Sequence, residues 1–372
     1  MWIEQLSNGK YKYSERYKHP YSNKLKKVTI TLPNKSRQTQ KEAQIILNNK
    51  IADALNKGDV KNQNLTFKEL YDEWYEVYQK QVAEGTYLPT KNALKRVIRD
   101  IGEDTLVSNI NTLLLNEVLD RYIYKDNLSN KYVTILKTKI NLIMKYAIRK
   151  GYIKDNPVDK VELNFKREFK TEKIKDKFLE DDEYKKIIDY TEKHNERYSL
   201  LFQWLYLTGM RPGEALALQK SDIHDDKVTI NGTLLYRERK VSEMVKSERT
   251  KTAAGMREID LPPKALVIVE ELLKLSPKGD FLFQTSNGTP LSLNAINTYL
   301  RNHKVKMGLP PDKPLSSHIF RHTHISKLAE IGTPMYVIQD RVGHEDSKIT
   351  QQIYLHVTKK TKEKLKSDLE KL

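Results

Sequence analysis

The start of the chain carries an alternation of apolar and polar residues that predicts a small β-sheet followed by a helix. Aromatic and polar residues alternate over residues 11–18, and residues 27–32 are rich in β-branched side chains until a Pro-Asn pair ends the run. Residues 39–57 then carry apolar side chains at helical spacing, closed by Gly58. We therefore predict a first domain over residues 1–62.

The middle of the chain has helical periodicity throughout. Thr66, with Glu69 three residues later, is typical of a capping box at the start of a helix. The aromatic residues of this first helix fall on one stripe, which favours a place in a hydrophobic core over base stacking. Helical patterns cover residues 67–78, 89–101, 111–124 and 130–150. We predict an all-helical second domain over residues 63–165, and the charged stretch 160–177 is typical of a linker.

The last part mixes helices with short β segments. Helical patterns cover residues 181–192, 198–208, 263–275, 293–306, 318–331 and 334–342. Residues 227–235 and 257–261 are β-like, with a polar excursion between them. This order predicts a third domain over residues 172–372, of α+β class and dominated by helix. The fold class is thus multidomain, with a small sheet and helix, an all-α domain and a mainly α domain in that order.

The net charge of the chain indicates what kind of partner it binds. The net charge is +17 and the isoelectric point is near 9.5, which favours a polyanionic partner. Residues 1–64 contain 13 Lys and Arg against 5 Asp and Glu, a net of +8, so the excess is concentrated at the N-terminus. Such clustering favours a nucleic-acid surface, and a basic sheet can enter a DNA groove. The alternatives are the general lysine enrichment of an AT-rich genome and a charged face with core tyrosines behind it.

Composition also excludes several classes of protein. The chain has no cysteine, which excludes disulfides and thiolate metal sites. It has no apolar run long enough to span a bilayer, and its first ten residues lack the apolar core of a signal peptide. We expect a soluble, intracellular protein.

The candidate chemistry lies in the third domain. The residues are Arg211, Lys251, His318, Arg321, His344 and Tyr354. Each is weak evidence alone, since Tyr354 is one of 21 tyrosines and most tyrosines serve packing. His318 and His322 have the spacing of a helical zinc pair, but no third ligand accompanies them. A tyrosine accompanied by arginines, lysine and histidines suits attack on a phosphodiester, and we expect neither metal nor cofactor.

Taken together and in order, these segments resemble the tyrosine recombinase (phage integrase) family. Flanking residues match as well: Leu207-Thr208-Gly209 precede the first arginine, His322-Thr323 follow the second, and Ile338 to Gly343 precede the histidine. Val342 stands where leucine is usual, and Lys251 shares its excursion with Lys240, Lys246 and Arg249. The first two domains resemble the arm-binding and core-binding domains of integrases of the lambda type.

The resemblance implies a role for each residue. Tyr354 would attack the scissile phosphate to leave a 3′-phosphotyrosyl bond, and Arg211 and Arg321 would clamp the non-bridging oxygens. Lys251 would protonate the leaving 5′ oxygen, His318 would act as general base, and His344 would donate a hydrogen bond to phosphate.

Glu214, one helical turn after Arg211, would orient neighbouring side chains. The alternative is an exposed helix carboxylate.

The resemblance also implies partners. We expect double-stranded DNA with core-type and arm-type sites, a homotetramer that exchanges strands through a Holliday junction, and a DNA-bending protein and an excisionase as accessory factors. The C-terminal stripe of Leu365, Leu369 and Leu372 would dock on a neighbouring protomer, or alternatively pack on its own domain. The task would be integration and excision of a prophage or mobile element, in the cytoplasm of a bacterial host cell and in association with its nucleoid. Rival interpretations are a chromosome-dimer resolvase, a type IB topoisomerase and a DNA-binding regulator without catalysis.

Overall fold

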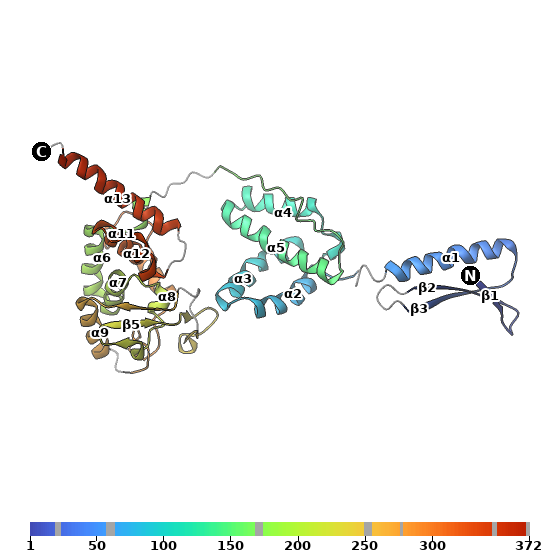
Figure 1. Cartoon of the computed structure of the whole chain (residues 1–372), viewed down its shortest axis with the longest axis horizontal. Helices are drawn as coiled ribbons and strands as arrows, with labels where there is room; N and C mark the ends of the chain where they lie inside the picture. Colours follow the sequence, from blue (N-terminus) through green and yellow to red (C-terminus); the bar gives the residue numbers. More distant parts are fainter. Residues whose placement is uncertain are drawn as a thin grey trace. The chain divides into compact units, whose positions relative to one another are not determined.

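The computed structural model describes residues 1–18, 24–56, 64–167, 174–248, 255–275, 278–343 and 348–369. The contacts within the chain divide it into two compact units, Met1–Glu168 and Phe169–Leu372, and Figure 1 traces the elements of each. The predicted division into three domains stays a prediction.

The first unit begins with a three-stranded antiparallel sheet and one helix. The sheet has the order β1-β2-β3, with β1 at Trp2–Gln5, β2 at Tyr11–Lys18 and β3 at Leu25–Leu32. Helix α1 (Arg37–Asn56) packs along the sheet (Figure 1), where Tyr13 is buried against Ala43 and Leu47. The sequence predicted β2, β3 and α1 but missed β1, because four residues are too few to reveal an alternation.

The same unit continues with four helices around their own hydrophobic cluster. They are α2 (Phe67–Gln81), α3 (Glu84–Ile101), α4 (Thr112–Tyr124) and α5 (Asn130–Lys150). The capping box is confirmed: the Thr66 hydroxyl accepts from the Glu69 amide, and the Glu69 carboxylate accepts from the Thr66 amide. The aromatic stripe is confirmed as core, since Tyr71, Trp74 and Tyr78 are buried.

One helix start was predicted wrongly. The pattern placed the beginning of α3 at Pro89, whereas the helix begins at Glu84 with Pro89 inside it. Proline lacks the N–H that would bond to the carbonyl four residues earlier. The helix tolerates this loss near its start, where Thr86 and Tyr87 have already bonded to the Ala83 carbonyl.

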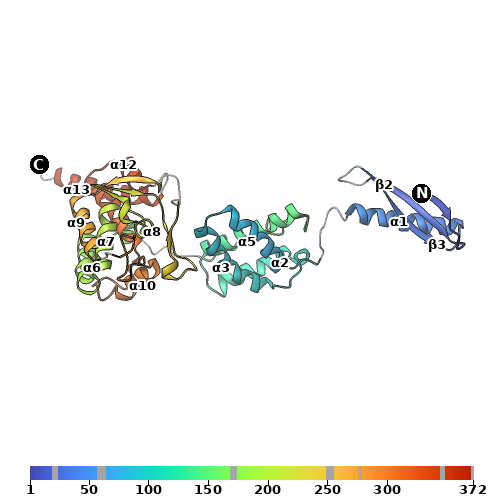
Figure 2. The ribbon, with the colours of Figure 1, turned by 90° about the horizontal axis from the view of Figure 1, so that it is seen from below.

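The second unit is mainly helical. Its helices are α6 (Asp181–His194), α7 (Glu196–Thr208), α8 (Pro212–Ala215), α9 (Pro263–Leu275), α10 (Leu293–His303), α11 (His318–Glu330), α12 (Met335–Val342) and α13 (Lys348–Leu369). Helix α7 lies between α6 and α9 in Figures 1 and 2 and also packs against α11. Short 3₁₀ helices occur in this unit at Ile174–Lys177, Lys220–Asp222 and Val241–Glu243, and in the first unit at Val107–Asn109.

Two small antiparallel sheets accompany these helices. One has the order β4-β5-β8, with β4 at Ile223–His224, β5 at Lys227–Ile230 and β8 at Arg257–Asp260, and the other pairs β6 (Leu234–Leu235) with β7 (Val245–Lys246). The single β segment predicted over residues 227–235 is therefore wrong. The backbone at Gly232 approaches the Ser247 carbonyl so closely that a Cβ atom would lie 2.4 Å from it, and the chain passes from one sheet to the other there.

Candidate active site

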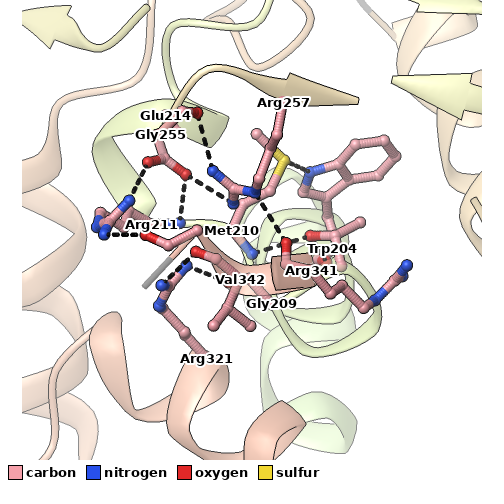
Figure 3. A network of polar contacts seen from close by, with 12 residues as sticks. Trp204, Gly209, Met210, Arg211, Glu214, Gly255, Arg257, Arg321, Arg341 and Val342 are labelled. Atoms are coloured by element: carbon pink, nitrogen blue, oxygen red, sulfur yellow. Dashed lines mark hydrogen bonds and ion pairs between the residues drawn. The ribbon is translucent and has the colours of Figure 1, made fainter. Parts of the chain in front are cut away.

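Two helix ends in the second unit lie beside a group of arginines (Figure 3). Gly209 caps the C-terminal end of α7 and Gly343 caps that of α12, both with left-handed backbones, at φ +65° and +68°. Gly209 has a further reason to be glycine, since a Cβ atom would lie 2.4 Å from Cδ2 of His324. The last carbonyls of a helix have no intrahelical donor and carry the negative end of its dipole. Both ends therefore favour cations.

Side chains from α11 and α12 satisfy the carbonyls at the end of α7. Arg321 donates from Nη1 to the Gly209 carbonyl at 2.6 Å. His324 donates from Nδ1 to the Tyr206 carbonyl at 2.8 Å and accepts at Nε2 from Nε of Arg341 at 3.2 Å. This pair of bonds fixes His324 as the neutral tautomer protonated at Nδ1.

Three arginines from three different elements satisfy three consecutive carbonyls at the end of α12 (Figure 3). Arg257 donates from Nε to the carbonyl of residue 341 at 2.8 Å. Arg321 donates from Nη2 to that of residue 342 at 2.5 Å. Arg211 donates from Nη2 to that of residue 343 at 2.8 Å. The end of α12 is thus joined to α8, β8 and α11.

Glu214 is the carboxylate of this cluster, and its side chain is only 3 % exposed. One oxygen accepts from Nη1 of Arg211 at 2.7 Å, and the other accepts from Nη2 of Arg257 at 3.2 Å. Burial alone would raise the pKa of Glu214, but the neighbouring charges of Arg257 and Arg211 hold it below its ordinary value. The alternative of an exposed helix carboxylate is wrong.

The cluster carries an excess of positive charge. Burial, reinforced by Arg211, lowers the pKa of Arg321 to about 9, while Glu214 opposes the shift. Arg321 therefore remains protonated at neutral pH although it is 1 % exposed. Arg211, Arg257 and Arg321 surround a single carboxylate, so these four side chains have a net charge of +2. A net positive charge of this kind favours an anion.

Helix α13 brings Tyr354 against the elements that hold this cluster. Tyr354 is partly buried in a hydrophobic cluster whose members come from α11, α12, α13 and the segment before α6: Phe178, Ile325, Ala329, Ile338, Val342, Ile353 and Val357. His318 begins α11 and is exposed, and Arg321 follows one turn later on the same helix. The fold thus unites Arg211, Glu214 and Arg321 in one network and packs the helix of Tyr354 against that of His318 and Arg321.

Two predicted residues, Lys251 and His344, lie outside the described residues. Lys246, which shares the excursion of Lys251, donates to both carboxylate oxygens of Asp222, at 2.8 and 2.6 Å. This lysine therefore has a structural partner of its own.

Sequence reasoning missed Arg257 and Arg341 as members of the network. Three of their partners are backbone carbonyls 81 to 134 residues away, and the sequence does not show which carbonyls will accept a side-chain hydrogen bond. The one available signal was an arginine opening the strand that pairs with β5.

The chain matches the model of the phage integrase family over residues 177–361, and that of the N-terminal SAM-like domain of phage integrases over residues 66–111. In the described residues no helix is both long and apolar enough to cross a membrane.

Among curated proteins, the chain is 34% identical to the prophage ps2 probable integrase of Lactococcus lactis, over 97% of each chain. Among solved structures it is similar to a lambda integrase dimer bound to a COC′ core site, with a TM-score of 0.62, 18% identity, and 95% and 94% of the two chains covered. A lambda integrase tetramer bound to a Holliday junction gives a TM-score of 0.60, with 18% identity and 94% of each chain covered.

The neutral state of His324 makes stability depend on pH. Burial, followed by the charge of Arg341, lowers the pKa of His324 to about 3, although the bond to Tyr206 opposes the shift. Below the ordinary histidine pKa of 6.5, the unfolded chain takes up a proton at this position that the folded chain does not. We expect the free energy of unfolding to fall as the pH is lowered from 6.5 to 5.

The change His324→Gln removes the titrating group, so urea unfolding should show a smaller slope of the free energy of unfolding against pH over this range. The variant should also be less stable at pH 7. An unchanged slope would show that His324 does not titrate as described. His224→Gln, in the two-residue strand β4, serves as a matched histidine control.

Proposed function

Since the chain belongs to the phage integrase family, the tyrosine recombinases of prophages and mobile elements, we propose that it cleaves and rejoins double-stranded DNA through a covalent bond between Tyr354 and a 3′ phosphate. The observation that carries the proposal is the buried cluster of Arg211, Arg257 and Arg321 around one carboxylate. A positive centre of this kind suits a phosphate that gains negative charge in the transition state.

In this proposal Arg211 and Arg321 bind the non-bridging oxygens of the scissile phosphate. Guanidinium groups bind phosphate through parallel N–H bonds and stay charged throughout the reaction. Arg211 is 23 % exposed, so a phosphate can reach it. Hydrogen bonds to Glu214 and to the end of α12 fix its orientation before DNA arrives.

The remaining roles follow from the family pattern. Tyr354 attacks phosphorus, the 5′ oxygen leaves, and Lys251 gives that oxygen its proton. His318 takes the proton of the tyrosine, and His344 donates a hydrogen bond to a phosphate oxygen. The phosphotyrosyl bond conserves the energy of the phosphodiester, so the return step needs neither a metal nor a nucleotide.

We further propose that a tetramer exchanges strands through a Holliday junction, with a DNA-bending protein and an excisionase as accessory factors. The lambda integrase tetramer on a Holliday junction, whose fold this chain shares, supports this assembly. The helices α2 to α5 and the second unit would bind a core site. The natural task would be integration and excision of the element that encodes the chain.

The N-terminal sheet would bind the arm site. Side chains on a strand alternate between its two faces, so Tyr13 faces α1 while Arg16 lies on the opposite face. Arg16 pairs with Lys27 on β3, and both lie over the ring of Trp2, at 5.2 and 5.9 Å from its centroid. Lys12 and Lys18 share this face by the same alternation. A basic face of this kind fits the phosphates of a duplex.

Covalent trapping tests the catalytic proposal. We expect the full chain to form a covalent complex with nicked suicide duplexes tiled across the DNA beside its gene. Tyr354→Phe should form none while binding the same duplexes, because it lacks the nucleophile. Tyr336→Phe, an exposed tyrosine on α12, is the control and should trap like the wild type.

Trapping by Tyr354→Phe would show that another residue attacks. A wild type that binds but never traps would favour the DNA-binding regulator, and relaxation of supercoiled plasmid without site preference would favour a topoisomerase.

Salt dependence tests the arm-binding proposal. Replacing both Arg16 and Lys27 by Gln should weaken binding to arm DNA and reduce the slope of log affinity against log salt by about 2, since each phosphate contact contributes about 0.9. Covalent trapping on an isolated core duplex should stay unchanged. Lys41→Gln, which changes an exposed lysine on α1, is the control. An unchanged slope in the double variant would place arm binding elsewhere.

A further inference from the structure

Arg257 joins three segments of the second unit that come from distant parts of the sequence. From the first position of β8 it donates to the Arg341 carbonyl from Nε, to the Gly255 carbonyl from Nη1 and to Glu214 from Nη2. Its side chain is only 8 % exposed. Arg257 therefore acts on the site through its protein partners.

The two oxygens of Glu214 are divided between two arginines. Oε1 accepts from the guanidinium of Arg211, while Oε2 accepts from Arg257 and from the Arg211 amide. A carboxylate and a guanidinium readily form two parallel bonds when nothing else holds the carboxylate. Without Arg257, Glu214 could turn both oxygens toward the Arg211 guanidinium and draw it away from the Gly343 carbonyl.

Arg257 also holds the last turn of α12. It donates a hydrogen bond to the first of the three consecutive carbonyls at the helix end, and Arg321 and Arg211 donate to the next two. The chain that follows leads to α13 and Tyr354. A shift of this helix end would move the anchor of Arg211 together with Val342, against which the helix that carries Tyr354 packs.

We propose that Arg257 is a positioning residue for DNA cleavage, which holds Glu214 and the end of α12 so that Arg211 and the helix of Tyr354 keep the geometry needed for attack on the phosphate. The inference rests on the proposed function and adds a residue that does not touch DNA. A displacement of about 1 Å in a reacting group can cost about 100-fold in rate. The effect should therefore appear in the rate of cleavage and leave DNA affinity nearly unchanged.

The experiment compares Arg257→Met, Arg257→Lys, Glu214→Gln and the double variant Arg257→Met/Glu214→Gln in the full chain. Single-turnover trapping on a suicide duplex gives the rate, gel shift gives DNA affinity, and urea unfolding gives stability. We expect Arg257→Met to cleave about 100-fold more slowly, with affinity within about threefold of the wild type. Arg257→Lys should recover part of the rate, because its ammonium can reach Glu214 but lacks the planar fork.

The double variant separates positioning from general stability. If Arg257 acts through Glu214, the reductions in cleavage rate caused by Arg257→Met and by Glu214→Gln are not additive in free energy. The double variant then cleaves no more slowly than the slower single variant. The matched control is Arg197→Met. Arg197 bonds to the carbonyls of Leu275 and Gln284, at the end of α9 and in the loop beyond, and its loss should lower stability but leave the cleavage rate unchanged below the unfolding transition.

Each outcome decides between the two proposals. A wild type that forms no covalent complex overturns the proposed function and this inference with it. If the wild type cleaves, three results would overturn the inference alone. Arg257→Met could cleave as fast as the wild type, or Arg197→Met could slow cleavage as much as Arg257→Met does. The third result is that the fold-reductions in cleavage rate of Arg257→Met and Glu214→Gln multiply fully in the double variant. Should Arg257→Met not fold, Arg257→Lys decides, with slower cleavage at unchanged affinity expected and a wild-type rate contradicting the inference.

Discussion

The second unit depends on one constraint: several arginines lie around a single carboxylate, and the repulsion between their positive charges must be offset. Glu214 supplies only one negative charge for Arg211, Arg257 and Arg321. The ends of α7 and α12 supply the rest, as carbonyl groups that carry the negative ends of two helix dipoles. Each arginine thus gains hydrogen bonds in place of the water it loses. The cluster remains positive overall, and this remaining charge is what a phosphate can use.

The same constraint explains how residues far apart in the sequence form one site. Arg321 bonds both to the end of α7, just before Arg211, and to the end of α12, just before the segment that leads to α13. Apolar contacts among α11, α12 and α13 then hold Tyr354 beside this framework. Polar bonds orient the arginines, and the hydrophobic cluster orients the helix of the proposed nucleophile, Tyr354. The ends of α7 and α12 therefore contact both the arginine network and, through α12, the helix of Tyr354.

Much of this could be predicted from the sequence, and the failures have physical causes. Periodicity found nearly every long helix, and the Thr66–Glu69 capping box was confirmed because both partners lie within one turn. The ordered residues from Arg211 to Tyr354 indicated the family. Arg257 and Arg341 were missed because they bind backbone carbonyls, which every residue possesses. The burial of Glu214 could not be read from a short helix, since its partner Arg257 lies 43 residues away. The passage between two sheets at Gly232 depends on a tertiary approach of the backbone.

We propose that this framework presents Tyr354, one of the 21 tyrosines of the chain, to a phosphate. Peptide mapping of the covalent DNA complex tests it most directly. Cleavage by trypsin after Lys348 and Lys359 releases a peptide, residues 349–359, whose sole tyrosine is Tyr354. After nuclease digestion, mass spectrometry should find the added nucleotide phosphate on that peptide. An adduct on any other tyrosine, or on a serine or histidine, would contradict the account.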